Sequence, residues 1–206
     1  MRRAITKILS GLMLAAMPVL ATAQTAVDNP ADPYIHPQTG MAFPANVAGA
    51  KRHQVDRYNA EGSDMGFGYQ VVRDGRMVAY LSIFVYPAPQ LGNDTPGERD
   101  RACALLSDGI KADILSHERD AKLVTEDKVA APSPNSRQFG LRVVYTGGSG
   151  KFDGKMQPLR EENDLFCYAG GKWLIAYRVS MPAGIDATAD VARVERAILW
   201  SDALAG

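Results

Sequence analysis

The segment from Asp164 to Met181 constrains the fold more than any other part of this sequence. It contains two apolar runs separated by the pair Gly170-Gly171, a pattern that predicts a β-hairpin because glycine adopts the positive φ of a tight primed turn. With a two-residue loop, one face would carry Phe166, Tyr168, Trp173, Ile175, Tyr177 and Val179, and the other Leu165, Cys167, Leu174 and Ala176. Because both faces are apolar, we expect this hairpin to lie inside a sheet that is covered on each side.

The N-terminus has the pattern of a secretion signal. A basic start precedes an apolar run over residues 8–20, and Ala21-Thr22-Ala23 places small residues at the spacing of a cleavage site. The run is shorter than the ~20 residues that a membrane span needs. We therefore expect residues 1–23 to be a signal peptide cleaved after Ala23. The mature protein would be periplasmic or secreted, with no transmembrane segment.

Length and charge narrow the class further. Residues 24–206 suffice for one ordinary domain with a substantial core. The chain carries 23 basic and 23 acidic residues, and Arg2, Arg3 and Lys7 belong to the signal segment, so the mature chain has a net charge of about −3. Its basic residues are scattered, without a patch or an alternation with aromatic residues, and the sequence therefore predicts no nucleic-acid partner.

Cys103 and Cys167 are the only cysteines in the sequence. Outside the cytoplasm an even pair favours a disulfide bond. The alternative is two buried free thiols, because cysteine also packs well as a small apolar residue. We favour the disulfide, which would join a helix to the central hairpin.

The remaining patterns predict strands, a long helix, further strands and a closing helix. Proline-rich residues 24–44 predict an extended arm that either lies on the domain or hangs free. Thr95-Pro96-Gly97-Glu98 is a capping box that predicts a helix from this point to about Glu118. Other ranges complete the prediction: strands over 48–58, 64–72, 77–86, 122–129 and 138–145, a turn at Asp74-Gly75, and a helix over 187–200.

This order of elements predicts a single α+β domain over residues 45–206, an antiparallel sheet with a helix on each face, or α/β/α sandwich. It runs from Phe43-Pro44-x-x-Val47-x-Gly49, through a helix after the third strand, to a final helix after a hairpin. In that order it resembles the PsbP-like α/β/α sandwich over most of residues 43–203. The resemblance implies a small extracytoplasmic or accessory protein, often without catalysis, and it transfers no functional residue to this chain.

Two glycine-rich motifs depart from nucleotide-binding patterns. In Gly147-Gly148-Ser149-Gly150-Lys151, Tyr145 takes the place of the first glycine of a phosphate-binding loop and Phe152 that of the Ser or Thr that holds magnesium. We interpret residues 147–150 as a flexible connection between strands. Gly66-Phe67-Gly68 lacks the third glycine of a dinucleotide fingerprint, and we interpret it as a strand pattern or a bulge.

Candidate sites for chemistry are few. His36, His53 and His117 have no metal-ligand spacing, and we predict no catalytic residue, no metal and no cofactor. Tyr168, Trp173 and Tyr177 either line a cavity for an apolar ligand or form a packed core beneath a helix, and the close packing of protein interiors favours the core.

Three functions are consistent with these observations. The preferred hypothesis is an exported, non-enzymatic accessory or interaction protein of the cell envelope. The alternative is a module that holds a small apolar ligand between sheet and helix. A hydrolase with a dispersed active site is the third hypothesis. The expected partner is accordingly an unidentified protein or a small apolar ligand.

Overall fold

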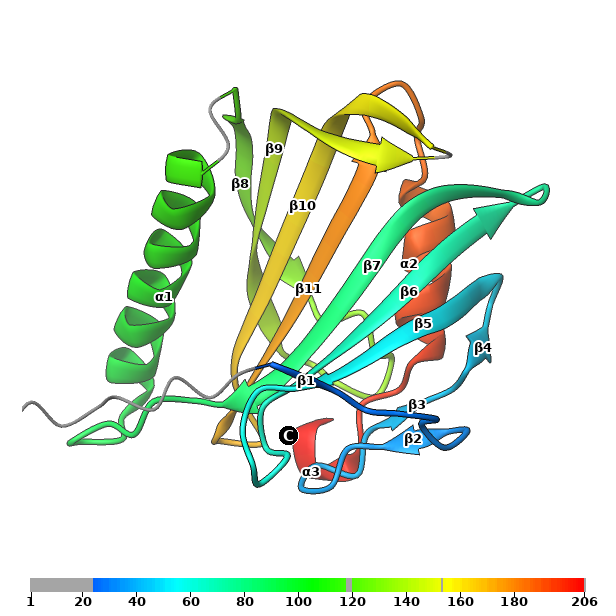
Figure 1. The fold of residues 1–206 in the computed structure, drawn as a ribbon. Coiled ribbons are helices and arrows are strands. Elements are labelled where there is room, and N and C mark those ends of the chain that lie inside the picture. Colours follow the sequence, from blue (N-terminus) through cyan, green and yellow to red (C-terminus); the bar gives the residue numbers. More distant parts are fainter. Residues whose placement is uncertain (1–23, 118–119, 153, 206) are drawn as a thin grey trace, which may run out of the picture.

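A computed structural model describes residues 24–117, 120–152 and 154–205 (Figure 1), so the predicted signal peptide lies outside the described residues. One large antiparallel sheet dominates the fold, with the order β1-β5-β6-β7-β11-β10-β9-β8 and with β4 also paired to β5. Its strands are β1 (Thr25–Ala26), β4 (Asn46–Val47), β5 (Ala50–Arg57), β6 (Met65–Arg73), β7 (Arg76–Pro87), β8 (Lys122–Ala130), β9 (Phe139–Phe152), β10 (Lys155–Ala169) and β11 (Trp173–Pro182). A small second sheet pairs β2 (Tyr34–Ile35) with β3 (Ala42–Phe43), and the helices are α1 (Pro96–His117), α2 (Thr188–Ala197) and α3 (Asp202–Ala205). The predicted α+β class with an antiparallel sheet is confirmed.

The predicted central hairpin is formed by β10 and β11, which lie in the middle of the sheet between β9 and β7. Its loop differs from the prediction, because Ala169 pairs with Trp173 and three residues, 170–172, make the connection. A register shift between Phe166 and Ala169 inserts an extra residue, and Tyr168 has a φ of +57°. This bulge turns Tyr168 away from the face that carries Trp173, so the predicted placement of Tyr168 on that face is wrong.

Residues 147–150 are not the flexible connection that we predicted. They belong to β9, and Gly147 and Ser149 pair with Leu159 and Pro158 of β10. Gly148 is the unpaired residue of a bulge, with a φ of +63°. Glycine here provides the backbone geometry of the bulge, and cross-strand pairing then keeps the segment in the sheet.

One face of the sheet carries the main core. Along β7 and β11, alternate residues such as Leu81, Ile83, Ile175 and Tyr177 point into it and are buried, as the period of two along a strand requires. The closing helix α2 ends earlier than predicted, at Ala197, but its apolar stripe of Val191, Val194 and Ile198 is buried in this core as expected. The C-terminal segment adds Trp200, whose Nε1 donates a 2.8 Å hydrogen bond to the Tyr177 hydroxyl.

The proline-rich arm lies on the domain. The ring of Phe43 stacks on Phe67 of β6, with 3.5 Å between the centroids. Arg52 is buried and donates hydrogen bonds to the carbonyls of Phe43 and Ala31, the latter at 2.7 Å. The hydroxyl of Tyr69 donates to the Pro44 carbonyl at 3.0 Å. Stacking and buried hydrogen bonds therefore fasten residues 31–44 to the sheet.

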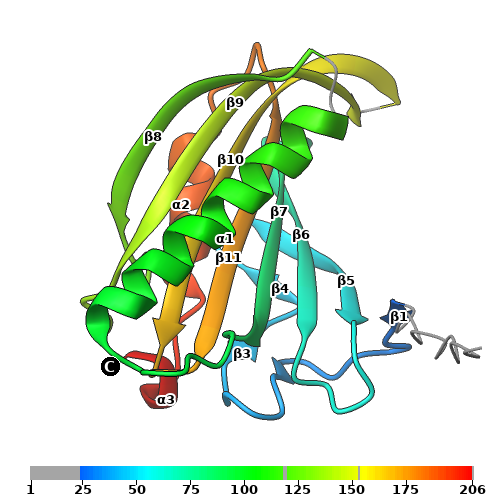
Figure 2. The ribbon, with the colours of Figure 1, turned by 90° about the vertical axis from the view of Figure 1, so that its left-hand side faces the viewer.

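Helix α1 is attached differently. It begins at the predicted capping box, where the Thr95 hydroxyl accepts a 3.3 Å hydrogen bond from the Glu98 N–H. Figure 2 shows α1 crossing in front of β9, β10 and β11, with α2 behind them. Within α1 only Ser107 and Ile114 are buried, so this helix lies over the sheet without packing tightly into it.

Candidate functional site

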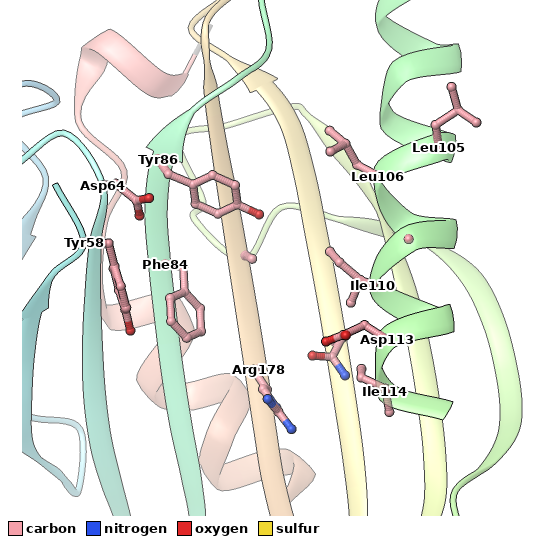
Figure 3. Close-up of a pocket in the computed structure, with 13 residues that line it drawn as sticks. Tyr58, Asp64, Phe84, Tyr86, Leu105, Leu106, Ile110, Asp113, Ile114 and Arg178 are labelled. Carbon is pink, nitrogen blue, oxygen red and sulfur yellow. The ribbon is translucent and has the colours of Figure 1, made fainter. Parts of the chain in front are cut away.

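A groove of about 680 Å³ lies between α1 and the sheet (Figure 3). It is lined by α1, by the connection between β5 and β6, by β7, and by the hairpin β10–β11. The lining residues are Tyr58, Asp64, Phe84, Tyr86, Leu105, Leu106, Gly109, Ile110, Asp113, Ile114, Asn163, Ala176 and Arg178. We call it the α1 groove. Its size lies within the range of about 300–1,000 Å³ that is usual for small-molecule sites.

The two walls of the α1 groove differ in chemistry. The helix contributes the aliphatic side chains of Leu106, Ile110 and Ile114, which repeat every four residues and therefore share one side of α1. The sheet contributes Phe84 and Tyr86, because alternation along β7 turns Ile83 and Val85 into the core and their neighbours towards α1. The groove is therefore aliphatic on one side and aromatic on the other.

Gly66 of β6 makes room for the aromatic wall. The ring of Tyr58 lies beside that of Phe84, with 6.3 Å between the centroids and 43° between the planes. A Cβ on Gly66 would lie 3.1 Å from the Tyr58 ring and 3.2 Å from the Phe84 ring. Side-chain atoms that close must move apart, so glycine at this position allows both rings to rest over β6. The Gly66-Phe67-Gly68 motif thus serves the strand, which agrees with its interpretation as a strand pattern.

Charged groups lie towards the two ends of the α1 groove. Figure 3 shows Asp64 beside Tyr58 and Tyr86, and Arg178 towards the opposite end. Arg178 forms an ion pair with Glu161 at 3.4 Å, and the Ser180 hydroxyl donates to the same Glu161 oxygen at 2.8 Å. Burial raises the pKa of the Asp64 carboxyl. Burial also raises the pKa of the Tyr86 hydroxyl, and the negative charge of nearby Asp64 raises it further.

The predicted disulfide is present. Cys103 of α1 is bonded to Cys167 of β10, with 5.8 Å between the Cα atoms. It lies beside the α1 groove rather than in it, and it fixes the N-terminal half of α1 against the hairpin. The ion pair between Lys111 and Glu126 of β8, at 2.6 Å, holds the helix further along.

Tyr168, Trp173 and Tyr177, for which we weighed a cavity lining against the favoured packed core, do not come together. Trp173 is buried on the core face, where His36 of the arm meets it edge to face at 5.6 Å. Tyr177 is buried on the same face and accepts the hydrogen bond from Trp200. Tyr168 lies on the α1 face, where the guanidinium of Arg99 is 5.4 Å from its ring centroid and its hydroxyl donates to the Pro89 carbonyl at 3.2 Å.

Sequence reasoning missed the residues that form the sheet side of the α1 groove: Tyr58, Asp64, Phe84 and Tyr86. A signal for two of them exists in residues 77–86, where aliphatic residues at odd positions from Leu81 alternate with Ser82, Phe84 and Tyr86. Aromatic and hydroxyl-bearing side chains on one strand face are typical of a partly solvated surface. Their meeting with Tyr58 and α1 depends on tertiary contacts that no local pattern contains.

Comparison with models of known protein families gives no match, and comparison with curated protein sequences gives none either. In the part of the chain that the structure describes, no helix is both long and apolar enough to cross a membrane. Among the same residues, no group of three or more His, Cys, Asp or Glu side chains is arranged to hold a metal ion. We therefore infer the function from the geometry of the α1 groove.

Proposed function

We propose that this protein is an exported, non-enzymatic accessory protein of the cell envelope that binds a small apolar ligand in the α1 groove. One observation carries the proposal: α1 lies across an apolar sheet face and leaves a groove between them that its own side chains do not fill. Protein interiors are normally packed to the density of organic crystals, so an apolar space of this size between two elements is typical of a binding site.

Exposure of the helix wall supports this proposal. Leu106 and Ile110 point from α1 towards the sheet and are only half-buried. A ligand lying between them and Tyr86 would remove apolar surface from water on both walls. Burial of such surface is favourable by roughly 25 cal/mol per Å². A ligand of modest size thus gains binding free energy without any change in the core.

Export and fold are part of the same proposal. The N-terminal pattern of residues 1–23 with cleavage after Ala23 supports a periplasmic or secreted location, and the Cys103–Cys167 disulfide supports an oxidising compartment. Residues 45–206 would form one domain, an α/β/α sandwich of the PsbP-like kind, with α1 and α2 as its outer layers. In this view α1 is the loosely fitted layer, which is where a ligand enters.

A titration with a neutral fluorescent probe, N-phenyl-1-naphthylamine, tests the proposed function. The probe emits strongly when it enters an apolar site, and the mature, disulfide-bonded protein should enhance its emission in a saturable way. Leu106→Asp places a charge on the helix wall and should weaken binding at least about tenfold, because the carboxylate would lose hydration on ligand binding.

Met156→Asp is the matched control, since Met156 is also an exposed apolar residue, 66% exposed, but lies in β10 near the turn after β9, away from the α1 groove. It should leave probe binding unchanged. Absence of saturable binding, or equal losses in the two variants, would contradict the proposed function.

A further inference from the structure

The end of the α1 groove at Asp64 has the composition of a site for an organic cation. Three aromatic side chains, Tyr58, Phe84 and Tyr86, lie around it together with one carboxylate (Figure 3). The faces of aromatic rings carry partial negative charge and attract cations, most strongly where water is displaced. A carboxylate beside such rings adds a full negative charge to the same place.

Backbone contacts hold Asp64 at this position. Its N–H donates to the Asn59 side-chain carbonyl at 3.3 Å, and its backbone carbonyl accepts a 2.9 Å hydrogen bond from the Tyr58 N–H. The side-chain carboxylate, by contrast, has no hydrogen bond or ion pair with any residue that the structure describes. A partly buried carboxylate without a partner is unfavourable in free energy, and a bound cation would supply that partner.

Neighbouring charges agree with a cationic ligand. Burial raises the pKa of the Tyr58 hydroxyl, and the nearby carboxylates of Asp56 and Asp64 raise it further. Asp56 is buried and accepts a 2.7 Å hydrogen bond from the Gln54 side-chain amide. Two negative charges therefore lie near the Tyr58 ring. An anionic ligand would be repelled at this end of the groove.

The opposite end of the groove sets the orientation of such a ligand. Arg178 lies there with Asp113 and is paired with Glu161, so the charges at this end offset one another, whereas the Asp64 carboxylate has no such partner among the described residues. Leu106 of α1 lies across the groove from Tyr86, and Ile110 lies further along α1 towards the Arg178 end, so the helix offers an aliphatic surface along the groove. The head of an elongated cation would thus lie at Asp64, and an alkyl chain would follow the helix wall.

We propose that the α1 groove binds a single-chain alkylammonium ion, with its cationic head among Tyr58, Phe84, Tyr86 and Asp64 and its chain along Leu106 and Ile110. This inference rests on the proposed function, because it names the class of ligand for the same groove. It adds a claim that an apolar groove alone does not make: the charge of the head decides affinity.

Isothermal titration calorimetry with three probes of one chain length tests this inference. The probes are decyltrimethylammonium, neutral decyl maltoside and anionic decyl sulfate, each below its micellar concentration and each added to the mature, oxidised protein. Decyltrimethylammonium should bind at least about tenfold more tightly than decyl maltoside, as expected for a cation between aromatic rings and a carboxylate. Decyl sulfate should bind more weakly than either.

Two pairs of variants locate the head. Asp64→Asn should remove most of the preference for the cation and leave binding of decyl maltoside within about twofold. Asp108→Asn is its control, because Asp108 also lies on α1 but does not line the α1 groove. It should leave the preference unchanged. Tyr86→Leu should lower cation affinity and Tyr86→Phe should not, because phenylalanine keeps the ring.

The possible outcomes are distinguishable. Equal binding of the three probes, or a preference that Asp64→Asn leaves intact, would overturn the inference while the groove remains an apolar site. Equal losses in the Asp64 and Asp108 variants would show general attraction between charges and would also overturn it. If none of the probes binds, both the inference and the proposed function fail.

Discussion

Cys103 in α1 is bonded to Cys167 in β10, although 64 residues separate the two in the sequence. Within α1 only Ser107 and Ile114 are buried, so the helix gains little stability from apolar packing. The disulfide bond is therefore a main attachment of α1 to the sheet. It also keeps the helix wall of the α1 groove opposite Phe84 and Tyr86.

Loss of this bond should destabilise the protein. By the chain-entropy model, a loop of this length stabilises the fold by roughly 4 kcal/mol, as an upper estimate. The paired variant with Cys103→Ser and Cys167→Ser should unfold at a lower urea concentration than the oxidised protein. Reductant should lower the midpoint of the oxidised protein and leave that of the variant unchanged. Coincident unfolding curves for all samples would contradict a stabilising role.

Glu195 of α2 should make stability depend on pH. Burial, helped by nearby Asp164 and Glu162 and opposed by Arg142 and Arg196, raises the pKa of its carboxyl to about 7. A raised pKa in the folded state means that the folded protein holds the proton more tightly than the unfolded chain, whose Glu has a pKa of about 4.5. The contribution of Glu195 to the free energy of unfolding is therefore complete at low pH. It is lost as the pH rises from about 4.5 to 7, and the loss is at most about 3 kcal/mol.

Glu195→Gln should flatten this dependence, because glutamine remains neutral. Urea unfolding at a series of pH values between 4.5 and 8 measures the effect. Glu61→Gln, at an exposed position, is the control and should keep the slope of the parent protein. A Glu195→Gln variant with the same slope as the parent would show that Glu195 does not cause it.

His36 should release the N-terminal arm in acid. It is fully buried, its Nδ1 accepts a 3.2 Å hydrogen bond from the Thr39 N–H, and burial lowers its pKa to about 4. Because the folded state disfavours protonated His36, the contribution of neutral His36 to stability is complete above about pH 6.5 and is lost as the pH falls towards 4. Hydrogen exchange in residues 34–43, corrected for its intrinsic pH dependence, should therefore increase in this range.

His36→Phe should suppress that increase, since phenylalanine cannot take up a proton. His117→Gln, at the exposed C-terminal end of α1, should leave it unchanged. Equal opening of the arm in acid for the parent protein and the His36 variant would contradict a role for this side chain.

Gly66→Ala should weaken ligand binding without unfolding the protein. The new Cβ would contact the rings of Tyr58 and Phe84 at 3.1 and 3.2 Å, so the rings must shift by a few tenths of an ångström. We expect a severalfold loss of affinity for N-phenyl-1-naphthylamine and a small loss of stability, of about 1 kcal/mol, typical for slight overpacking. Gly92→Ala is the control, since a Cβ there meets nothing within 4 Å. Unchanged affinity in Gly66→Ala would argue against the aromatic wall as part of the site.

Local patterns predicted the elements that depend on neighbouring residues. The Asp74-Gly75 turn has positive φ values of 50° and 74°, as a primed turn requires, and it joins β6 to β7 as predicted. The capping box at Thr95 marks the start of α1, and the Gly170-Gly171 pair between two apolar runs predicted the hairpin of β10 and β11. In each case the signal lies within a few residues of the structure that it specifies.

The errors have a common physical origin in contacts between distant residues. Glycine-rich residues 147–150 suggested a loop, but pairing with β10 holds them in β9 and uses Gly148 for a bulge. For the same reason, the bulge at Tyr168 places its ring on the sheet face opposite to the predicted one. A ligand space between sheet and helix was only the alternative hypothesis, at Tyr168, Trp173 and Tyr177, and the α1 groove was not predicted, because the meeting of Tyr58 with Phe84 and α1 depends on the tertiary fold.

The most direct test of the central claim is an NMR titration of Leu and Ile methyl groups in the mature protein with decyltrimethylammonium, and with decyl maltoside as the neutral probe. The account predicts that the methyl signals of Leu106, Ile110 and Ile114 shift first and saturate together, while those of Ile83 and Ile175, on the core face, do not change. No saturable shift in the α1 methyl groups, or shifts confined to Ile83 and Ile175, would contradict a binding site between α1 and the sheet.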